Sequence, residues 1–283
     1  MTHHFFEKDP SNKVIYHPTV SARGPWDPNS LHGRVISGLI AYEVETNYCD
    51  ASELENFQVT RITVDLFRPP PMSPLFAGGE VIRSGRRIKV IDVHISTDFP
   101  GRGITEIARG RVVMLRRSEN PPGAIWSPPP WDLKPPNEDH PPHSDTSSDS
   151  ESHLPMWQTV EDRQNSEGEY SNSTHSPELP IRKLAWIRET HNFISGEPAS
   201  PLVCVAQVAD VANPFANSGT KGLNYINADV SLYLQRNPVG SWIGTEAFYH
   251  DAYDGVSVGT IALYDRLGRI GTSTVCGLAQ TRS

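Results

Sequence analysis

The sequence contains the same arrangement of elements twice. In each copy, a helix with one apolar face is followed by a strand of alternating apolar and polar residues, which ends in an arginine shortly before a proline. Apolar residues recur every three or four positions over residues 30–45, which predicts a helix with one buried face. A second helix is predicted over residues 200–212. The strands that follow end at Arg68 and Arg236, 38 and 36 positions after the two helices begin. Two copies at this spacing are too few for a solenoid and predict a duplicated domain.

The strands of each copy are predicted from the alternation of apolar and polar residues. In residues 59–67, Ile62, Val64 and Leu66 face one way and polar side chains face the other, which is typical of a half-buried strand. The matching strand of the second copy covers residues 228–235. Further β-rich runs lie at residues 79–96, 105–115, 242–250, 256–264 and 270–279. One long helix against an antiparallel sheet, made twice, predicts an α+β pseudo-dimer.

Terminal residues of the two predicted helices fit known capping preferences. Asn29 or Ser30 is expected to cap the first helix, and Ser200 the second, with Pro201 at the first helical position. Asn213-Pro214 is expected to end the second helix.

The segment between the two copies has a different composition. Residues 119–178 contain 12 acidic and two basic side chains, and few apolar ones. Such a segment buries too little apolar surface to offset the entropy lost on ordering. We therefore predict an N-terminal unit at residues 1–120, a largely disordered Pro/Ser/acidic linker insert at 121–178, and a C-terminal unit at 179–283.

Charge and cysteine usage narrow the function classes. Outside that acidic stretch the chain carries 23 basic and 21 acidic side chains, so nothing in its charge favours nucleic acid or an anionic membrane as a partner. The three cysteines are widely spaced and form no CxxC pair, which indicates free thiols in a reducing compartment. No apolar run approaches the length of a membrane span. We expect a cytoplasmic protein without a metal site.

Several short motifs occur in an order that resembles a known family. They are Gly24-Pro25-Trp26 with His32-Gly33, Arg83-Ser84-Gly85-Arg86-Arg87, Ile226 to Ser231, Asn237 to Trp242, and Ala262 to Gly268. Together they resemble the TesB-like branch of the double-hotdog acyl-CoA thioesterases, over both halves and outside the insert. The resemblance implies an α+β double hotdog, two tandem units each with an antiparallel sheet wrapped around a long helix. It also implies hydrolysis of an acyl-CoA or related acyl thioester in lipid metabolism, without a cofactor.

The same resemblance implies three catalytic positions. The family has an Asp on the second helix, and a Thr and a Gln on strands, which orient a hydrolytic water. Here the Asp position matches Asp210, the Thr position falls on Asn227, and the Gln position falls on Cys276, or on Val275 if the register slips by one residue. Asn can replace Thr as donor and acceptor, whereas a thiol is weak in both roles. Asp210, Asn227 and Cys276 are therefore the candidate catalytic residues, and hydrolysis is expected to be weakened or lost.

The start of the first helix supplies the candidate substrate-binding residues His32, Gly33 and Arg34. A helix N-terminus has unpaired N–H groups and a positive dipole end, which suit a polarised carbonyl or an anion. The family usually has His-Gly-Gly here, so Arg34 is a departure; it is expected to reach either a CoA phosphate or an acidic partner residue. His32 is expected to be a structural hydrogen-bonding residue rather than a general base.

Three functions remain open from the sequence. The first is thioester hydrolysis, with Asp210 activating a water that Asn227 orients. The second is a non-hydrolytic binder of an acyl or polyketide-like ligand, which the missing Gln favours. The third is a hotdog dehydratase or isomerase, for which His32 would have to meet Asp210 across the two half-sites. A Cys–His–Asp triad is least favoured, because no His lies near Cys276 in the sequence. Association into a homodimer is an expectation from the family alone.

Overall fold

In the computed structural model, residues 3–25, 27–99, 101–127, 134–138, 157–162 and 183–280 are described. The helices are α1 (Gly33–Asn47), α2 (Ala51–Asn56), α3 (Pro201–Ala209), α4 (Ala212–Asn217) and the short 3-10 helix η1 (Val20–Ala22). The strands of the first half are β1 (His4–Lys8), β2 (Ile15–Pro18), β3 (Phe57–Leu66), β4 (Leu75–Ser84), β5 (Ile88–Phe99) and β6 (Gly103–Arg116). The later strands are β7 (Trp157–Asp162), β8 (Leu184–Glu189), β9 (Asn192–Ile194), β10 (Ser218–Gly219), β11 (Gly222–Leu223), β12 (Tyr225–Asn227), β13 (Asp229–Leu234), β14 (Trp242–Tyr253), β15 (Val256–Asp265) and β16 (Gly268–Ala279).

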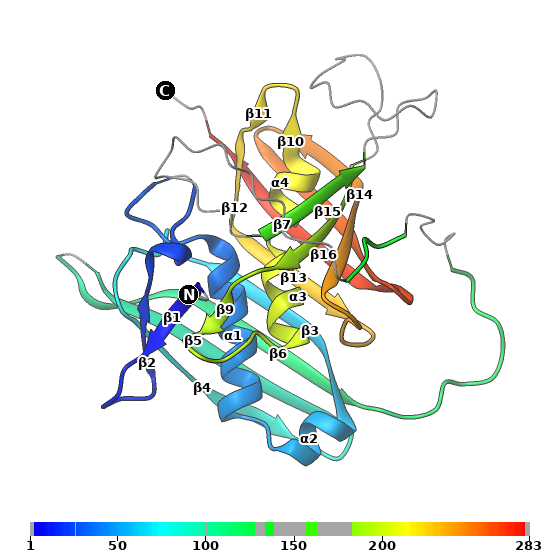
Figure 1. The fold of residues 1–283 in the computed structure, drawn as a ribbon, viewed down its shortest axis with the longest axis horizontal. Helices are drawn as coiled ribbons and strands as arrows, with labels where there is room; N and C mark the ends of the chain where they lie inside the picture. Colours follow the sequence, from blue (N-terminus) through cyan, green and yellow to red (C-terminus); the bar gives the residue numbers. More distant parts are fainter. Residues whose placement is uncertain are drawn as a thin grey trace.

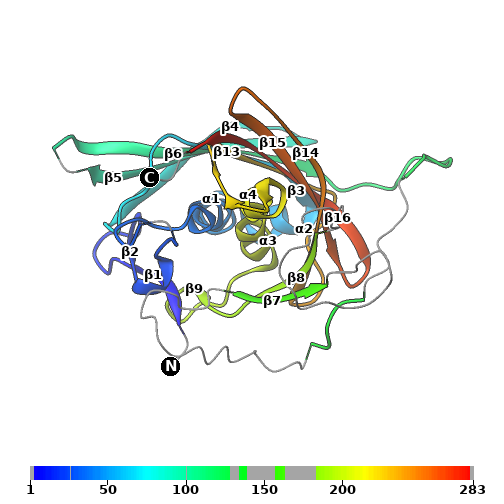
Figure 2. The same ribbon diagram turned by 90° about the horizontal axis from the view of Figure 1, so that it is seen from above.

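One continuous sheet runs through both halves of the described chain (Figure 1). Its strand order is β7-β8-β14-β15-β16-β13-β3-β6-β5-β4-β2-β1-β9, and β12 pairs with β16 beside this path. The halves join where β3 and β13 pair antiparallel, with Ile62 opposite Leu232. Figure 2 shows the strands arching over α1, α3 and α4, which lie together inside the curve. This arrangement confirms the predicted α+β double hotdog.

The long helix of the first half is more enclosed than its sequence pattern predicts. Every residue of α1 from Arg34 to Val44 is buried, rather than one apolar stripe. The sheet covers one side of α1, and α3 packs against another, because the two units place their helices next to each other. A helix between two partners is buried nearly all round.

The start of α1 differs from its prediction. The helix begins at Gly33, and its N-cap is His32, whose Nδ1 accepts a hydrogen bond from Arg34 N–H at 3.1 Å. Asn29 and Ser30 instead belong to a turn, because both of their N–H groups donate to Asp27. Sequence spacing alone could not separate a turn from the first helical turn at this point.

The second helix was predicted correctly at its start and wrongly at its end. Ser200 Oγ accepts from Val203 N–H at 3.1 Å, and Pro201 is the first residue of α3. The helix ends at Ala209, and α4 begins at Ala212 with Pro214 in its first turn. Proline is tolerated there because first-turn N–H groups have no intrahelical acceptor.

Two strand pairings differ from the predicted division into units, and one of them, between β9 and β1, links the halves. Strand β9, after the insert, pairs parallel with β1 at the N-terminal edge. Strand β7, inside the predicted insert, pairs antiparallel with β8. The Glu138 carboxylate also accepts from the Ser241 N–H and hydroxyl. The predicted disorder in the middle of the insert concerns residues outside the described ranges, and the unit boundaries stay predictions.

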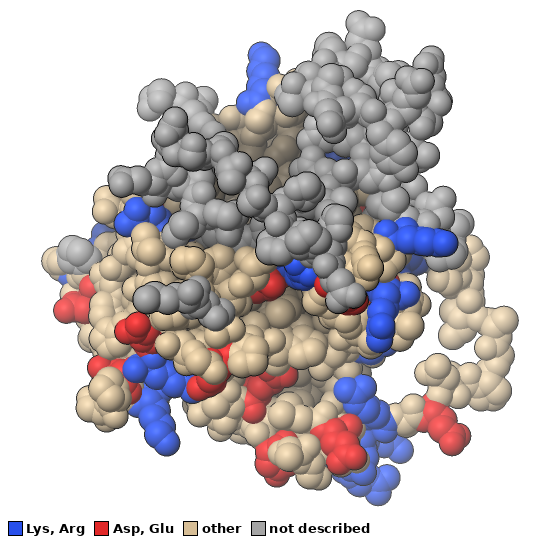
Figure 3. Space-filling view, in the orientation of Figure 1, with Lys and Arg blue, Asp and Glu red and all other residues tan. Residues whose placement is uncertain are grey.

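Charge on the described surface is mixed. On the face in Figure 3, basic and acidic side chains alternate over the described residues instead of forming a patch of one sign.

None of the helices in the described ranges is both long and apolar enough to cross a membrane.

Close approach of α1 and α3 depends on Gly38. A Cβ at this position would lie 2.6 Å from Phe193 Cε2 and 2.8 Å from Gln207 Cγ. We expect Gly38→Ala to lower the free energy of unfolding by about 1–3 kcal/mol through overpacking, although Ala exceeds Gly in helix propensity by about 1 kcal/mol. Urea unfolding measures the change. Ser37→Ala is the matched control, since it removes a buried hydroxyl that has no hydrogen-bond partner among the described residues and should not destabilise. A stabilised Gly38→Ala would contradict the packing argument.

Two of the motifs noted in the sequence contact each other through Asp265. Its carboxylate accepts from both terminal nitrogens of Arg236, from Val239 N–H at 2.7 Å and from Leu267 N–H at 2.8 Å. Burial opposes ionisation, but the hydrogen bonds from Arg236 and the two backbone N–H groups outweigh it and lower the pKa of Asp265. These motifs therefore hold the β13–β14 and β15–β16 connections together.

Asp265→Asn is expected to reduce the free energy of unfolding by about 2–4 kcal/mol at pH 7, because the amide keeps one acceptor and turns a donor toward Arg236. A carboxyl with a lowered pKa in the folded state contributes stability above its unfolded pKa of about 3.9 and loses it as the pH falls. The difference between variant and wild type should therefore shrink below about pH 4. Urea unfolding at several pH values tests this; equal stabilities at pH 7 would refute it.

Candidate active site

Asp210 lies where the helices of the two halves meet. It is the C-cap of α3 and is buried. Its Oδ1 accepts from Asn227 Nδ2 at 2.9 Å. A Cβ on Gly33 would lie 3.0 Å from the same oxygen, so the missing side chain brings the carboxylate against the N-terminus of α1. The carboxylate thus lies at the C-terminus of α3 and faces the positive end of the α1 dipole.

His32 faces Asp210 from the other half of the protein. Its Nδ1 lies 3.4 Å from Asp210 Oδ2. The same nitrogen accepts from Arg34 N–H, which places the proton of the neutral ring on Nε2. His32 therefore caps α1 and borders the carboxylate, as predicted for a structural hydrogen-bonding residue. Sequence positions 32 and 210 come together only because the two hotdog units place α1 and α3 side by side.

Asn227 is held from both ends of its amide. It is the last residue of β12 and lies opposite Gly277 of β16. Its Nδ2 donates to Asp210, and its Oδ1 accepts from Asn213 Nδ2 at 3.3 Å. The structure thus brings together Asp210, Asn227, His32 and Gly33, four of the six residues predicted from the sequence.

Arg34 does not belong to this group. Its side chain is fully buried, and its Nη1 donates to Glu189 Oε2 at 2.5 Å. Burial lowers the pKa of Arg34 to about 10, although Glu189 opposes that shift. Of the two predicted roles, the acidic partner is the one observed; the phosphate-binding role is corrected, because a guanidinium enclosed in the core does not reach a substrate phosphate.

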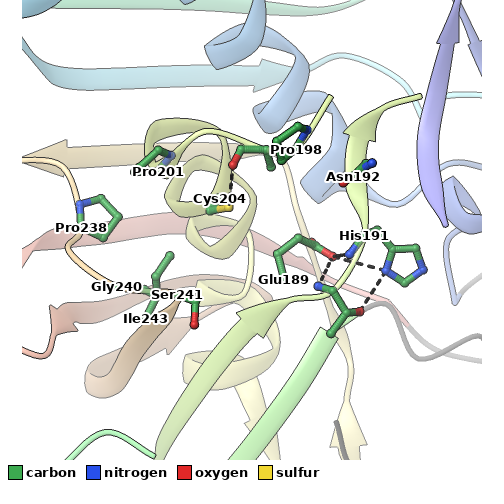
Figure 4. Close-up of a pocket in the computed structure, with 12 residues that line it drawn as sticks. Glu189, His191, Asn192, Pro198, Pro201, Cys204, Pro238, Gly240, Ser241 and Ile243 are labelled. Carbon is green, nitrogen blue, oxygen red and sulfur yellow. Dashed lines mark hydrogen bonds and ion pairs between the residues drawn. The ribbon is translucent and has the colours of Figure 1, made fainter. Parts of the chain in front are cut away.

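Glu189 also borders a cavity of about 340 Å³ (Figure 4). Figure 4 shows Glu189 and His191 on one side, Pro201 and Cys204 of α3 on another, and the loop before β14 on the third. Desolvation raises the pKa of the Cys204 thiol to about 12, so this cysteine stays protonated and unreactive at neutral pH.

Cys276 is also separate from the candidate site. Its side chain is exposed, and its backbone N–H donates to Asp229 Oδ1 at 2.6 Å. Partial burial and the nearby Asp229 carboxylate raise the pKa of its thiol. Side chains alternate along β16, so the buried neighbour Val275 faces the core instead. The prediction of Cys276 as a catalytic residue is corrected by this parity, and the inward position carries no polar group.

Three polar residues near the site were missed. Asn213 and Asn217 are buried on α4 and extend the hydrogen bonding behind Asn227. Their spacing of four would have placed them on one helix face, but the predicted helix ended before them. Glu189 lies on a strand that was not predicted, so no pattern indicated it.

Within the described ranges, no group of three or more His, Cys, Asp or Glu side chains could hold a metal ion.

The fold is similar to several solved structures. The tesB protein of Mycobacterium avium subspecies paratuberculosis aligns with a TM-score of 0.64 at 12% identity, over 96% of this chain and 95% of that one. Acyl-CoA thioesterase II TesB2 of Mycobacterium marinum gives 0.59 at 13% identity, over 97% and 96%. A hot dog fold protein of unknown function from Alicyclobacillus acidocaldarius gives 0.64 at 13% identity, over 98% and 96%. At such identities the likeness concerns the fold alone. A comparison with curated proteins found no match.

Family models decide the relationship. The acyl-CoA thioesterase N-terminal domain matches residues 22–115, and the acyl-CoA thioesterase C-terminal domain matches residues 137–275. The two domains occur in the order that the family requires, one in each half of the continuous sheet. The chain therefore belongs to the acyl-CoA thioesterase family that these domain models describe, and it has the double hotdog fold.

Proposed function

We propose that the protein hydrolyses an acyl-CoA, or a related acyl thioester, to the free acid and the thiol. The family domains support thioester hydrolysis in general. The observation that carries the specific proposal is the buried Asp210 carboxylate, which Asn227 holds against the N-terminus of α1. A general base needs a fixed position within reach of the water, and the hydrogen bond from Asn227 supports that position.

In the proposed reaction, Asp210 takes a proton from a water that attacks the thioester carbonyl carbon. The Asn227 amide fixes Oδ1 and leaves Oδ2 to accept the proton. The N–H of Gly33, at the positive end of α1, is the proposed donor to the oxygen of the tetrahedral intermediate. When the carbon–sulfur bond breaks, the proton on Asp210 passes to the leaving thiolate. One water is consumed, and one acid and one thiol are formed.

The rate is expected to be lower than in a site with a second orienting amide. Val275 faces inward where the polar residue of the family is expected, so of the two expected orienting residues Asn227 is the one left to orient the water. By comparison with the loss of an oxyanion donor, one missing hydrogen bond lowers the rate by about 10²–10³-fold.

The test is incubation with acetyl-, octanoyl- and palmitoyl-CoA, with free acid and CoA measured by mass spectrometry. Release that depends on Asp210 supports hydrolysis, and the panel defines the chain-length class. A thermal shift with acyl-CoA but no release from any substrate would refute hydrolysis and favour the non-hydrolytic binder.

Dehydration of a hydroxyacyl thioester is a second candidate, favoured by one contact. His32 and Asp210 lie 3.4 Å apart, which brings together the His and the carboxylate that such a reaction needs. Hydrolysis ranks first because Nδ1 of His32 is occupied by Arg34 N–H. A hydroxyacyl-CoA converted to a product lighter by one water, with no free CoA, would reverse this order.

The cytoplasmic location, the role in lipid metabolism and the homodimer remain proposals.

A further inference from the structure

Four hydrogen bonds connect Asp210 to a second cavity of the C-terminal half. Asn227 Nδ2 donates to Asp210 Oδ1 at 2.9 Å, and Asn213 Nδ2 donates to Asn227 Oδ1 at 3.3 Å. Asn217 Nδ2 donates to Asn213 Oδ1 at 2.9 Å, and the ring Nδ1 of His250 lies 2.9 Å from Asn217 Oδ1. We call these three amides the asparagine chain.

The direction of the asparagine chain is fixed at two places. Asn227 Nδ2 faces Asp210 Oδ1 and, at 3.4 Å, the backbone carbonyl of Asp229, which only accepts, so the NH₂ group of Asn227 lies on this side. A backbone carbonyl also only accepts, and Asn213 Nδ2 donates to Tyr225 C=O at 3.1 Å. With these two amides set, Asn217 must give its NH₂ to Asn213, and its oxygen is left to accept from His250. Every amide therefore points its donor toward Asp210.

The sheet leaves room for the Asn217 amide, the one farthest from Asp210. Cβ atoms on Gly259 and Gly277 would lie 2.6 Å from Asn217 Oδ1 and 3.2 Å from Asn217 Nδ2, respectively. Asn213 and Asn217 are buried, so the bonds within the chain are shielded from water. Buried amides of this kind are costly unless each finds its partners, and here each does.

The asparagine chain ends at a cavity of about 290 Å³, lined by His250, Tyr225, Asn224 and Asn217 among others. Tyr225 packs edge-on against the His250 ring at 6.1 Å. Because Nδ1 must donate to Asn217, Nε2 is the ring nitrogen left for a partner outside the chain.

We propose that Asn213 and Asn217 are positioning residues, which lock the amide of Asn227 so that its NH₂ group faces the Asp210 carboxylate. If Asn227 turned over, its oxygen would face the carboxylate, and Nδ2 would lose its contacts with Asp210 Oδ1 at 2.9 Å and with the Asp229 carbonyl oxygen at 3.4 Å. The inference rests on the proposed hydrolysis for its effect on rate, and on geometry alone for its effect on Asn227.

The experiment compares Asn213→Ala and Asn217→Ala with Asn224→Ala. Asn224 lines the same cavity from an exposed position and does not belong to the asparagine chain. We expect kcat to fall about tenfold for Asn213→Ala, less than for a direct donor, with KM within twofold. A smaller fall is expected for Asn217→Ala, and none for Asn224→Ala. Asn213→Ala in an Asn227→Ala background should cost no further rate, because the effect passes through Asn227.

Side-chain amide NMR of Asn227 provides a readout that does not need turnover. We expect its NH₂ resonances to shift or double in Asn213→Ala and to stay unchanged in Asn224→Ala. If wild type shows no turnover but these resonances respond, the proposed hydrolysis fails while the positioning role stands. Unchanged resonances and unchanged kcat in folded Asn213→Ala would overturn the role. Asn217→Ala, judged by the same two readouts, decides the matter if Asn213→Ala does not fold.

Discussion

Asp210→Asn is expected to reduce acyl-CoA hydrolysis by about 10²–10⁴-fold, the usual contribution of a positioned general base. The amide has the shape of the carboxylate and can still accept from Asn227, but it does not take a proton from water. The Gly33 contact leaves no space for a larger side chain, so an isosteric change is the correct one. Turnover with the best acyl-CoA of the panel measures the effect, and thermal unfolding shows whether the fold is kept.

Asp229→Asn is the matched control for this experiment. Asp229 lies two residues after Asn227 and is half-buried. Burial is the largest influence on the pKa of its carboxyl group and raises it. Its Oδ1, however, binds the N–H of Cys276, whose side chain is on the exposed face of β16. We expect turnover of this variant within a few-fold of wild type. A small loss in Asp210→Asn would remove Asp210 from the mechanism, and equal large losses in both would indicate a structural cause.

Glu189→Ala is expected to lower the free energy of unfolding by about 3–5 kcal/mol, the cost of breaking a buried ion pair from one side. Arg34 on α1 faces this carboxylate with a fully buried side chain, and the Phe5 ring lies 4.6 Å from its guanidinium carbon. Glu189 also accepts from the N–H groups of Thr190 and His191 at 2.9 and 3.0 Å. Its loss leaves the desolvated guanidinium without this carboxylate and two backbone donors without their acceptor.

Urea unfolding with two comparison variants tests this prediction. Glu106→Ala breaks the pair with the exposed Arg109 and the contact with His94 at 2.8 Å, both at the partly exposed surface of the sheet, and should cost no more than about 1 kcal/mol. The double variant Arg34→Met with Glu189→Leu should recover the part of the lost stability that comes from the desolvated guanidinium, because apolar residues often replace a buried pair without loss. The N–H groups of Thr190 and His191 still lack the Glu189 acceptor in this variant. A Glu189→Ala cost as small as that of Glu106→Ala would show that the pair contributes little to the contact between the halves.

Local patterns in the sequence identified much of the fold. The three- and four-residue spacing in α1 and the alternation in β3 arise from the geometry of a helix and a strand, so they are visible without tertiary contacts. Short strands such as β9 carry no such pattern, because three residues show no period. Pro214 misled the prediction of a helix end, because a proline that stops one helix also suits the first turn of the next.

The sequence by itself determined the duplicated plan, through local periodicity, and the family motifs, through residue order. Asp210 was chosen through the family resemblance that those motifs carry. Only the tertiary structure decided which polar groups meet. His32 reaches Asp210 across 178 positions, Arg34 turns to Glu189, and strand parity directs Val275 inward and Cys276 outward. The physical reason is that a single residue of register reverses the face of every side chain in a strand, and that contact between the two helices depends on how both sheets curve.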